Sequence, residues 1–314
     1  MLCIKDRILG GLWGLLIGDA LGVPYEFNRP EDLPEPEQIE YQPPLNFMRS
    51  HSGVLPGTWS DDGAQALCLL DSLLSCGKMD INDFASRLLK WYDIGLWAVG
   101  NKVFDVGNQT ARALIAYRNG KSPYESGNII PEGKGNGSLM RVLPLALWHK
   151  GSDEELVNDA HLQSLVTHGH ACNQVCCALY CLWARRLLEG HSINEAYNLA
   201  VLRLRQIYKE DSEFYHELEW SIRPDEPPVG KGGGFVVDSL RSVRMVLVSD
   251  NYEQVVKSAI ALGDDTDTTA AIAGGLAGIY FGVDNIPERM YLGLRGKEMV
   301  YPLINKFLEY SEWI

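Results

Sequence analysis

Two short acidic segments hold the residue types most suited to binding a metal ion. The first runs from Trp59 to Gly63 (WSDDG) and the second from Gly263 to Ala270 (GDDTDTTA). Their carboxylate and hydroxyl oxygens are the ligands that hard divalent cations such as Mg²⁺ and Mn²⁺ prefer. Neither segment contains the His or Cys that a zinc site would favour.

Each segment also has a simpler interpretation as the start of a helix. Ser60 can cap a helix, and the two following aspartates suit the helix dipole. In the second segment three carboxylates fall within four residues, and the dipole of one helix start cannot offset their mutual repulsion. The alternative for this segment is a charged, solvated helix entry. Taken together, the segments predict a binuclear site in which two closely spaced cations clamp substrate oxygens.

Two further motifs give weaker signals. A glycine-rich turn from Gly133 to Arg141 enters a predicted helix, and its backbone N–H groups could hold a phosphate. The turn lacks the residue order of a P-loop, and a helix entry without a ligand is the alternative.

His168 and His170 precede several cysteines. A zinc site there is conceivable, but packing within a buried helix is the favoured interpretation. These cysteines are Cys172, Cys176, Cys177 and Cys181.

The elements that must position these residues are predicted to be helices. Apolar residues recur every three or four positions, alternating patterns are almost absent, and no linker divides the chain. The sequence therefore predicts one all-α domain over residues 1–314 with about ten or more helices. The clearest periodic segments are Ala64 to Leu74, Phe84 to Trp91, Cys176 to Leu188, Val236 to Val248 and Ala270 to Tyr280. Ile222 to Gly234 is rich in Pro and Gly and is predicted to be a long loop.

Two rows of glycines suggest how the acidic segments meet. One row is Gly10, Gly14, Gly18 and Gly22, and the other is Gly274, Gly278 and Gly282, continued by Ala270. Four-residue spacing keeps small residues on one face of a helix, where two backbones can approach closely. Close packing against unrelated partners is one interpretation. If the two helices instead pack on each other in antiparallel fashion, residues 19–26 come close to Asp265 and Asp267.

Composition and charge limit the classes of partner. The 314 residues carry 28 Lys and Arg against 41 Asp and Glu, a net charge of −13, with no basic run for duplex nucleic acid or an acidic membrane surface. We find no stretch of about 18 apolar residues, so no segment is expected to span a membrane. Ile8 to Gly18 resembles a signal peptide but is interrupted by glycines, so a cytoplasmic location is expected. Seven cysteines do not form a disulfide framework.

The order of motifs along the chain resembles the ADP-ribosylglycohydrolase family, which includes the dinitrogenase reductase-activating glycohydrolase and the animal ADP-ribosyl-acceptor hydrolases. Any one motif is weak, whereas seven in the family's order are specific. They are Gly14 to Glu26, Trp59 to Asp62, Asp105 to Thr110, Gly135 to Arg141, Thr167 to His170, Gly234 to Val237 and Gly263 to Thr268.

The resemblance implies an all-α orthogonal bundle with two Mg²⁺ or Mn²⁺ ions at the base of an ADP-ribose cleft. The implied metal ligands are Ser60, Asp61, Asp62, Asp265, Asp267 and Thr268. The implied substrate-binding residues are Asn136, Gly137 and Ser138 at the diphosphate, with His168 and Phe235 along the cleft. Glu26 would lie over the metals, and Glu26, Asp105 and Asp61 are the candidate catalytic residues; the sequence does not decide whether Glu26 or Asp105 moves the proton.

The activity that the resemblance implies is hydrolysis of the N-glycosidic bond between ADP-ribose and arginine of a modified protein. A serine, polymer, DNA-base or O-acetyl linkage is the alternative substrate class. A non-catalytic ADP-ribose binder or immunity protein, paired with a cognate ADP-ribosyltransferase, is a further hypothesis. A structural, crystallin-like role would require missing metal ligands, and none of the implied ligands is missing.

Overall fold

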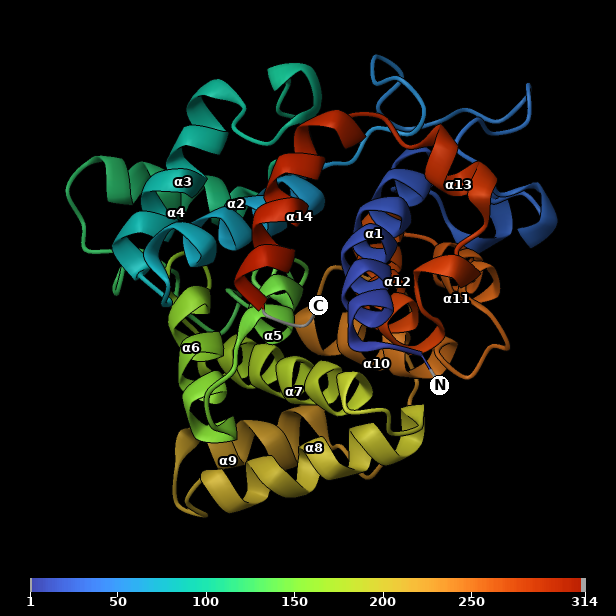
Figure 1. Cartoon of the computed structure of the whole chain (residues 1–314). Coiled ribbons are helices and arrows are strands. Elements are labelled where there is room, and N and C mark those ends of the chain that lie inside the picture. The colour runs from blue at the N-terminus through green and yellow to red at the C-terminus, as the bar shows by residue number, and fades with distance from the viewer. Residues whose placement is uncertain (1, 312–314) are drawn as a thin grey trace.

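The computed structural model describes residues 2–311, which form an all-α bundle (Figure 1). Within these residues there are fourteen α-helices and no strand, which confirms the predicted fold class. The helices are α1 Ile4–Gly22, α2 Asp61–Cys76, α3 Ile81–Ile94, α4 Asn108–Arg118, α5 Leu143–Trp148, α6 Asp153–Leu165, α7 Ala171–Leu188, α8 Ile193–Ile207, α9 Glu213–His216, α10 Val236–Val246, α11 Tyr252–Ile260, α12 Thr266–Phe281, α13 Glu288–Gly293 and α14 Lys297–Ser311. Residues 1 and 312–314 of the predicted domain lie outside the described residues.

Four of the five periodic segments named above lie entirely within helices α2, α3, α7 and α12, and the fifth covers α10. The predicted segment from Val236 runs two residues past the end of α10 at Val246. The predicted loop begins where a π-helical turn, Glu217–Ile222, ends, and it continues without a helix to the start of α10. Single 3₁₀ turns cover Val23–Tyr25, Pro30–Asp32, Pro36–Gln38, Val99–Asn101 and Val283–Asn285.

Helices α1 and α12 lie side by side through the centre of the molecule, as Figure 1 shows, and they run antiparallel. A Cβ atom added at Gly10 would lie closer than 3.0 Å to the carbonyl oxygen of Gly278, and one at Gly18 would be equally close to that of Ala270. At Gly22 the same added atom would meet the backbone of Asp267. The two glycine rows therefore pack on each other, which brings the end of α1 to the start of α12.

The buried core continues from this pair into α7. That helix is buried from Ala171 to Ala184, and the Tyr180 hydroxyl donates a hydrogen bond of 2.9 Å to the Ile272 carbonyl in α12. In Figure 1, α7 and α8 run across the bundle below α1. Burial of this continuous apolar surface is the dominant force that holds the helices together.

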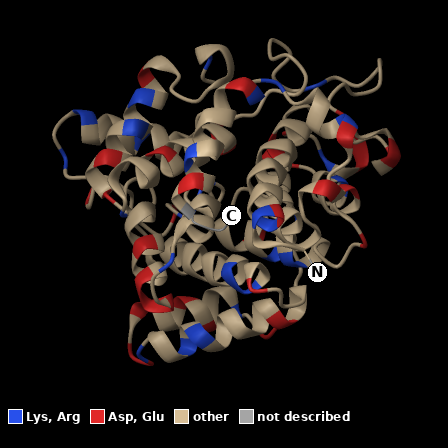
Figure 2. Ribbon diagram, in the orientation of Figure 1, with Lys and Arg blue, Asp and Glu red and all other residues tan. Residues whose placement is uncertain are grey.

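The expectation that the chain has no apolar stretch long enough to span a membrane is wrong. Among the described residues, α1 together with the 3₁₀ turn that follows it, Ile4–Tyr25, is long and apolar enough to cross a membrane by length and composition alone. In the structure, 94% of its most apolar window is buried inside the molecule, so this helix packs as part of the core. Figure 2 shows Lys and Arg spread over the molecule and mixed with Asp and Glu, in agreement with the absence of a basic run in the sequence.

Candidate active site

Three helix ends meet at one place and bring the two acidic segments together. The buried Asp19 carboxylate on α1 accepts hydrogen bonds from the backbone N–H groups of Ser60 (2.8 Å) and Gly63 (2.7 Å), and so holds the start of α2. The Thr266 hydroxyl donates to the Gly22 carbonyl (2.8 Å) and holds the start of α12 at the same end of α1. Asp19 was not singled out as a site residue from the sequence.

Direct hydrogen bonds join the two segments. The hydroxyl groups of Thr268 and Ser60 both donate to Asp62 Oδ2, each at 3.2 Å. Ser60 is also the N-cap of α2, since its hydroxyl accepts from the Asp62 N–H (3.3 Å), so its capping role and its place in the cluster coexist. The Asn136 side chain donates to Asp265 Oδ2 (2.8 Å), which connects the glycine-rich turn to the same cluster.

The buried carboxylates have the properties of a cation site. Asp62 Oδ1 and Asp267 Oδ2 are buried and have no hydrogen-bond partner. Carboxylate oxygens of Glu26, Asp265 and Asp267 lie within 4.8 Å of one another. Burial, reinforced by the neighbouring carboxyl groups, raises the pKa values of Asp61, Asp62 and Asp267 well above the ordinary range. The residues present therefore fit hard divalent cations bound by oxygen ligands.

The raised pKa values predict how the metal-free protein responds to pH. Burial raises the pKa of Asp19 to about 7, whereas an unfolded aspartate has a pKa of about 3.9. The folded state therefore holds protons that the unfolded state releases, so stability falls as the pH rises from about 4 through about 7. We expect the melting temperature in chelator to be lower at pH 8 than at pH 5. Mg²⁺ or Mn²⁺ should raise it more at pH 8, where the acids are ionised.

Thermal melts with and without metal at the two pH values measure this effect. Asp19→Asn is the matched variant, because it removes one titrating carboxyl while keeping an acceptor oxygen, and its melting temperature should depend less on pH. A melting temperature in chelator that rises between pH 5 and pH 8 would contradict the raised pKa values of these buried acids.

A cavity of 520 Å³ opens above the acids. Its lining includes eight of the residues selected from the sequence, together with Phe27, Gly107, Asn108, Gln109, Thr110, Gly135, Met140, Gly234 and Asp264. Those eight are Glu26, Asp61, Asp105, Asn136, Gly137, His168, Asp265 and Thr268. Ser60, Asp62, Ser138, Phe235 and Asp267 do not line it. No Lys or Arg lines this cavity, so its polar surface consists of carboxylates, hydroxyls, amides and one imidazole.

The glycine-rich turn is held by hydrogen bonds from several neighbouring segments. The Gly135 carbonyl accepts from the Asn173 side chain (2.6 Å), and the Asn136 N–H donates to the Gly234 carbonyl (3.1 Å). Ser138 is fully buried, and its hydroxyl accepts from the Ser164 hydroxyl (2.9 Å), so its side chain faces the core. Phe235, 47% exposed, lies outside the cavity lining as the N-cap of α10.

His168 is a neutral imidazole. It is buried, its Nδ1 lies 2.8 Å from the Thr167 hydroxyl, and burial lowers its pKa to about 3. His170 caps α7, where its Nδ1 accepts from the Cys172 N–H (3.1 Å). Among residues 2–311, no group of three side chains in metal-binding range includes a cysteine, and the four cysteines of α7 are buried in the core. The burial of these cysteines in the core agrees with the packing interpretation of that helix.

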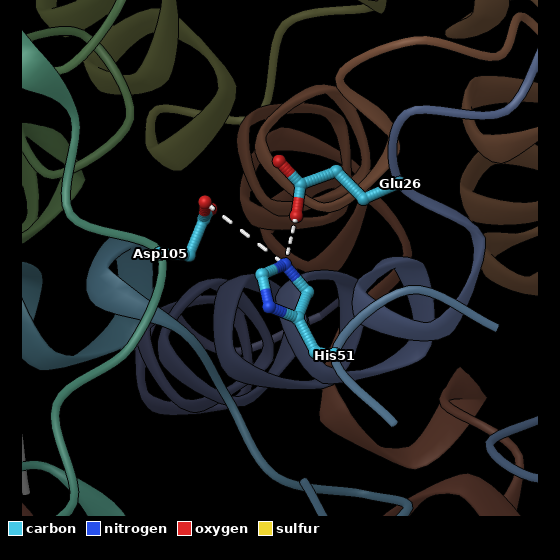
Figure 3. A group of neighbouring side chains, drawn as sticks. All are labelled: Glu26, His51 and Asp105. Atoms are coloured by element: carbon cyan, nitrogen blue, oxygen red, sulfur yellow. Dashed lines mark hydrogen bonds and ion pairs between the residues drawn. The ribbon is translucent and has the colours of Figure 1, made fainter. Parts of the chain in front are cut away.

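His51 joins Glu26 and Asp105, as Figure 3 shows, and sequence reasoning missed it. Its Nε2 lies 2.6 Å from Glu26 Oε2 and 4.0 Å from Asp105 Oδ1. Burial, reinforced by the nearby carboxyls of Asp105, Asp265 and Asp61, raises the pKa of Glu26 to about 11. The only available signal for His51 was a histidine in a loop nine residues before Ser60, and no periodic pattern marks it.

Backbone strain gathers around this group. Positive φ angles occur at seven described residues other than glycine, and four of these lie at the site. They are Phe27 (62°), His51 (49°), Asp105 (53°) and Asp264 (54°). Residues other than glycine rarely adopt this region, and such strain concentrates at functional sites.

The chain is similar to known proteins over most of its length. The chain is 32% identical to "ADP-ribosylarginine hydrolase Tri1" of Serratia proteamaculans over 90% of its own length and 74% of that protein. It is 28% identical to "ADP-ribosyl-(dinitrogen reductase) glycohydrolase" of Rhodospirillum rubrum, covering 91% and 89% of the two chains.

A solved structure is similar over almost the full length. It is described as "ADP-ribosylglycohydrolase-related protein complex", and it matches with a TM-score of 0.78 and 29% identity over 98% of this chain and 99% of its own. The sequence model of the ADP-ribosylglycohydrolase family matches residues 3–313. With the motif order and the helical architecture, this match shows that the chain belongs to the ADP-ribosylglycohydrolase family.

Proposed function

We propose that this protein is a metal-dependent hydrolase that removes ADP-ribose from arginine residues of ADP-ribosylated proteins and so reverses the modification. The observation that carries the proposal is the buried cluster of acids beneath a 520 Å³ cavity edged by the glycine-rich turn. The relatives named ADP-ribosylarginine hydrolase, at 32% and 33% identity, support arginine as the acceptor.

The proposed cofactor is a pair of divalent cations, Mg²⁺ or Mn²⁺. The residues that would hold them are Ser60, Asp61, Asp62, Asp265, Asp267 and Thr268, all contributed by the starts of α2 and α12. When bound, such cations would orient the ribose hydroxyls and stabilise charge at the reacting centre. Their positive charge would also compensate the buried carboxylates, because no Lys or Arg lines the cavity above them.

The rest of the cavity would bind and orient ADP-ribose. In this proposal, the turn containing Asn136 and Gly137 binds the diphosphate through backbone N–H groups, because no Lys or Arg lines the cavity. This arrangement explains how a chain of net charge −13 accepts an anionic ligand. The neutral His168 lines the same cavity and offers an apolar ring face with a hydrogen-bonding edge.

Proton transfer is assigned to the pair Glu26 and Asp105. Hydrolysis breaks the bond between the anomeric carbon and the guanidine nitrogen of arginine; water supplies oxygen to the carbon, and a proton goes to the departing guanidine. Glu26 and Asp105 both line the cavity, and His51 hydrogen-bonds to Glu26 and lies 4.0 Å from Asp105, so this group can hold a proton close to the departing guanidine.

A panel of acceptor linkages tests the proposal. The purified chain with Mn²⁺ or Mg²⁺ is given ADP-ribose linked to arginine, serine, a DNA base or an acetyl group, and polymeric ADP-ribose, and free ADP-ribose is measured over time. We expect release from the arginine linkage at a rate well above all others. Preferred release from another linkage would replace the acceptor assignment, and binding of ADP-ribose without release from any of them would favour a binding role.

A further inference from the structure

Phe27 adopts a conformation at the cavity that packing does not explain. Its side chain is 69% exposed although it is large and apolar, and it lines the cavity beside Glu26. Its φ of 62° lies in the left-handed region, which is costly for a bulky residue. An exposed side chain on a strained backbone contributes little to stability, so the presence of phenylalanine here indicates a role in binding.

The surrounding backbone imposes this conformation. The Phe27 N–H donates to the Asp264 carbonyl (2.7 Å), and the Asp264 N–H donates to the Asn28 carbonyl (2.8 Å). These two bonds fasten the segment after α1 to the segment before α12. Glycine adopts a positive φ without strain and would serve the same turn, so the turn alone does not account for an aromatic residue at position 27.

Phe27 belongs to a row of three rings that borders the carboxyl pair. The centroid of the His51 ring lies 5.8 Å from that of Phe27 and 5.2 Å from that of Phe104, so His51 stands between them. The same imidazole contacts Glu26 and Asp105. Aromatic faces next to carboxylate oxygens form an environment that suits a planar cation such as a guanidinium, which stacks on rings and donates from its edge.

Phe27, the one ring of this row that lines the cavity, also lies where the acceptor would have to be. The lining residues of the cavity fall into two connected groups: Asn136, Gly137 and His168 around the glycine-rich turn, and Glu26, Phe27 and Asp105 around His51. If the first group takes the diphosphate of ADP-ribose, the group attached at the far end of the ribose is left to the second.

We propose that Phe27, supported from behind by the rings of His51 and Phe104, forms the acceptor wall of the site and recognises the planar guanidinium of ADP-ribosylated arginine. This inference rests on the proposed function and deepens it by naming the residues that select the acceptor. Phe27 is thus a residue that determines specificity: it contacts the leaving group and takes no part in holding the cations or the diphosphate.

Phe27→Gly is the informative variant, because it removes the ring and relieves the strain at the same position. The measurements are kcat/KM on an arginine-linked ADP-ribosyl peptide, the Kd of free ADP-ribose by calorimetry, and the melting temperature. We expect kcat/KM to fall about tenfold, an effect between those of an exposed and a desolvated cation–π contact, while Kd changes by less than about twofold. The melting temperature should stay close to that of the wild type or rise.

Three further variants sharpen the test. Phe27→Tyr keeps an aromatic face and should leave kcat/KM close to that of the wild type. Phe104→Leu should lower kcat/KM, as Phe27→Gly does. Trp220→Ala is the matched control, because Trp220 is also an exposed aromatic residue but lines no part of this cavity.

The outcomes separate the inference from the proposed function. Unchanged kcat/KM in Phe27→Gly, or an equal loss of ADP-ribose affinity, would overturn the acceptor wall while the arginine activity of the wild type stands. A wild-type chain that releases ADP-ribose only from other linkages would overturn the proposed acceptor and this inference together.

Discussion

Asp267→Asn should almost abolish release of ADP-ribose while the fold persists. Asp267 is fully buried at the start of α12, where its Oδ1 accepts from the Thr268 N–H (2.8 Å) and its Oδ2 has no partner. Asparagine has nearly the same shape but lacks the charge that a cation requires. Because metal ions contribute several kcal/mol to such reactions, we expect turnover to fall about a thousandfold or more.

The melting temperature of Asp267→Asn in the absence of metal should not fall with its turnover. Asp267→Asn removes one acid from a cluster of buried carboxyl groups that repel one another when ionised, so its melting temperature in chelator should equal or exceed that of the wild type. Added Mn²⁺ or Mg²⁺ should raise the melting temperature of the wild type by mass action, and that of the variant much less. Turnover assays and melts measure both effects.

Asp284→Asn is the matched control for this charge removal. Asp284 is an exposed aspartate in the 3₁₀ turn after α12, away from the cluster, and its replacement should change neither turnover nor the response to metal. Asp267→Asn with turnover close to that of the wild type would contradict the two-cation site.

Gly278→Ala should be among the most destabilising single substitutions outside the cluster. An added Cβ at this position would lie closer than 3.0 Å to the Gly10 carbonyl carbon and oxygen, which are backbone atoms of α1 and cannot rotate away. The two central helices would have to separate, and the contacts along their whole interface would loosen. We expect a loss of about 3 kcal/mol in the free energy of unfolding, despite the better helix propensity of alanine.

Gly53→Ala gives the comparison for this effect. Only the flexible end of Lys102 lies within 4 Å of a Cβ added at Gly53, so the change should alter the free energy of unfolding by less than about 1 kcal/mol. Denaturant unfolding of both variants and the wild type measures the difference. Similar stability of the two variants would show that α1 and α12 tolerate separation.

The glycine spacing allowed a contact between helices near the two ends of the chain to be predicted. Rows of glycine at four-residue spacing near the two ends of the chain indicated a close antiparallel pair of helices, and that pair brings Gly22 against Asp267. The chemistry of the acidic segments then indicated what the pair positions. Local patterns sufficed here because helix periodicity and steric size act over short distances in sequence.

The loops around the site could not be predicted in the same way. His51 and Phe27 take their positions from hydrogen bonds to distant segments, such as that from the Phe27 N–H to the Asp264 carbonyl, and no periodic pattern encodes these bonds. The burial of the Ser138 side chain could not be predicted for a similar reason, because its hydrogen-bond partner Ser164 lies on α6, in a distant part of the sequence. The roles of Asn136, Ser138, His168 and Phe235 toward a ligand remain predictions from the family resemblance.

Release of ADP-ribose from an arginine-modified protein by the metal-stripped chain tests the central claim most directly. The stripped chain is assayed alone, with added Mg²⁺ and with added Mn²⁺, beside Asp267→Asn under the same conditions. We predict no release without metal, restored release with at least one of the two ions, and none from the variant. Full release in the presence of chelator, or no release with either ion from folded protein that binds ADP-ribose, would contradict the account.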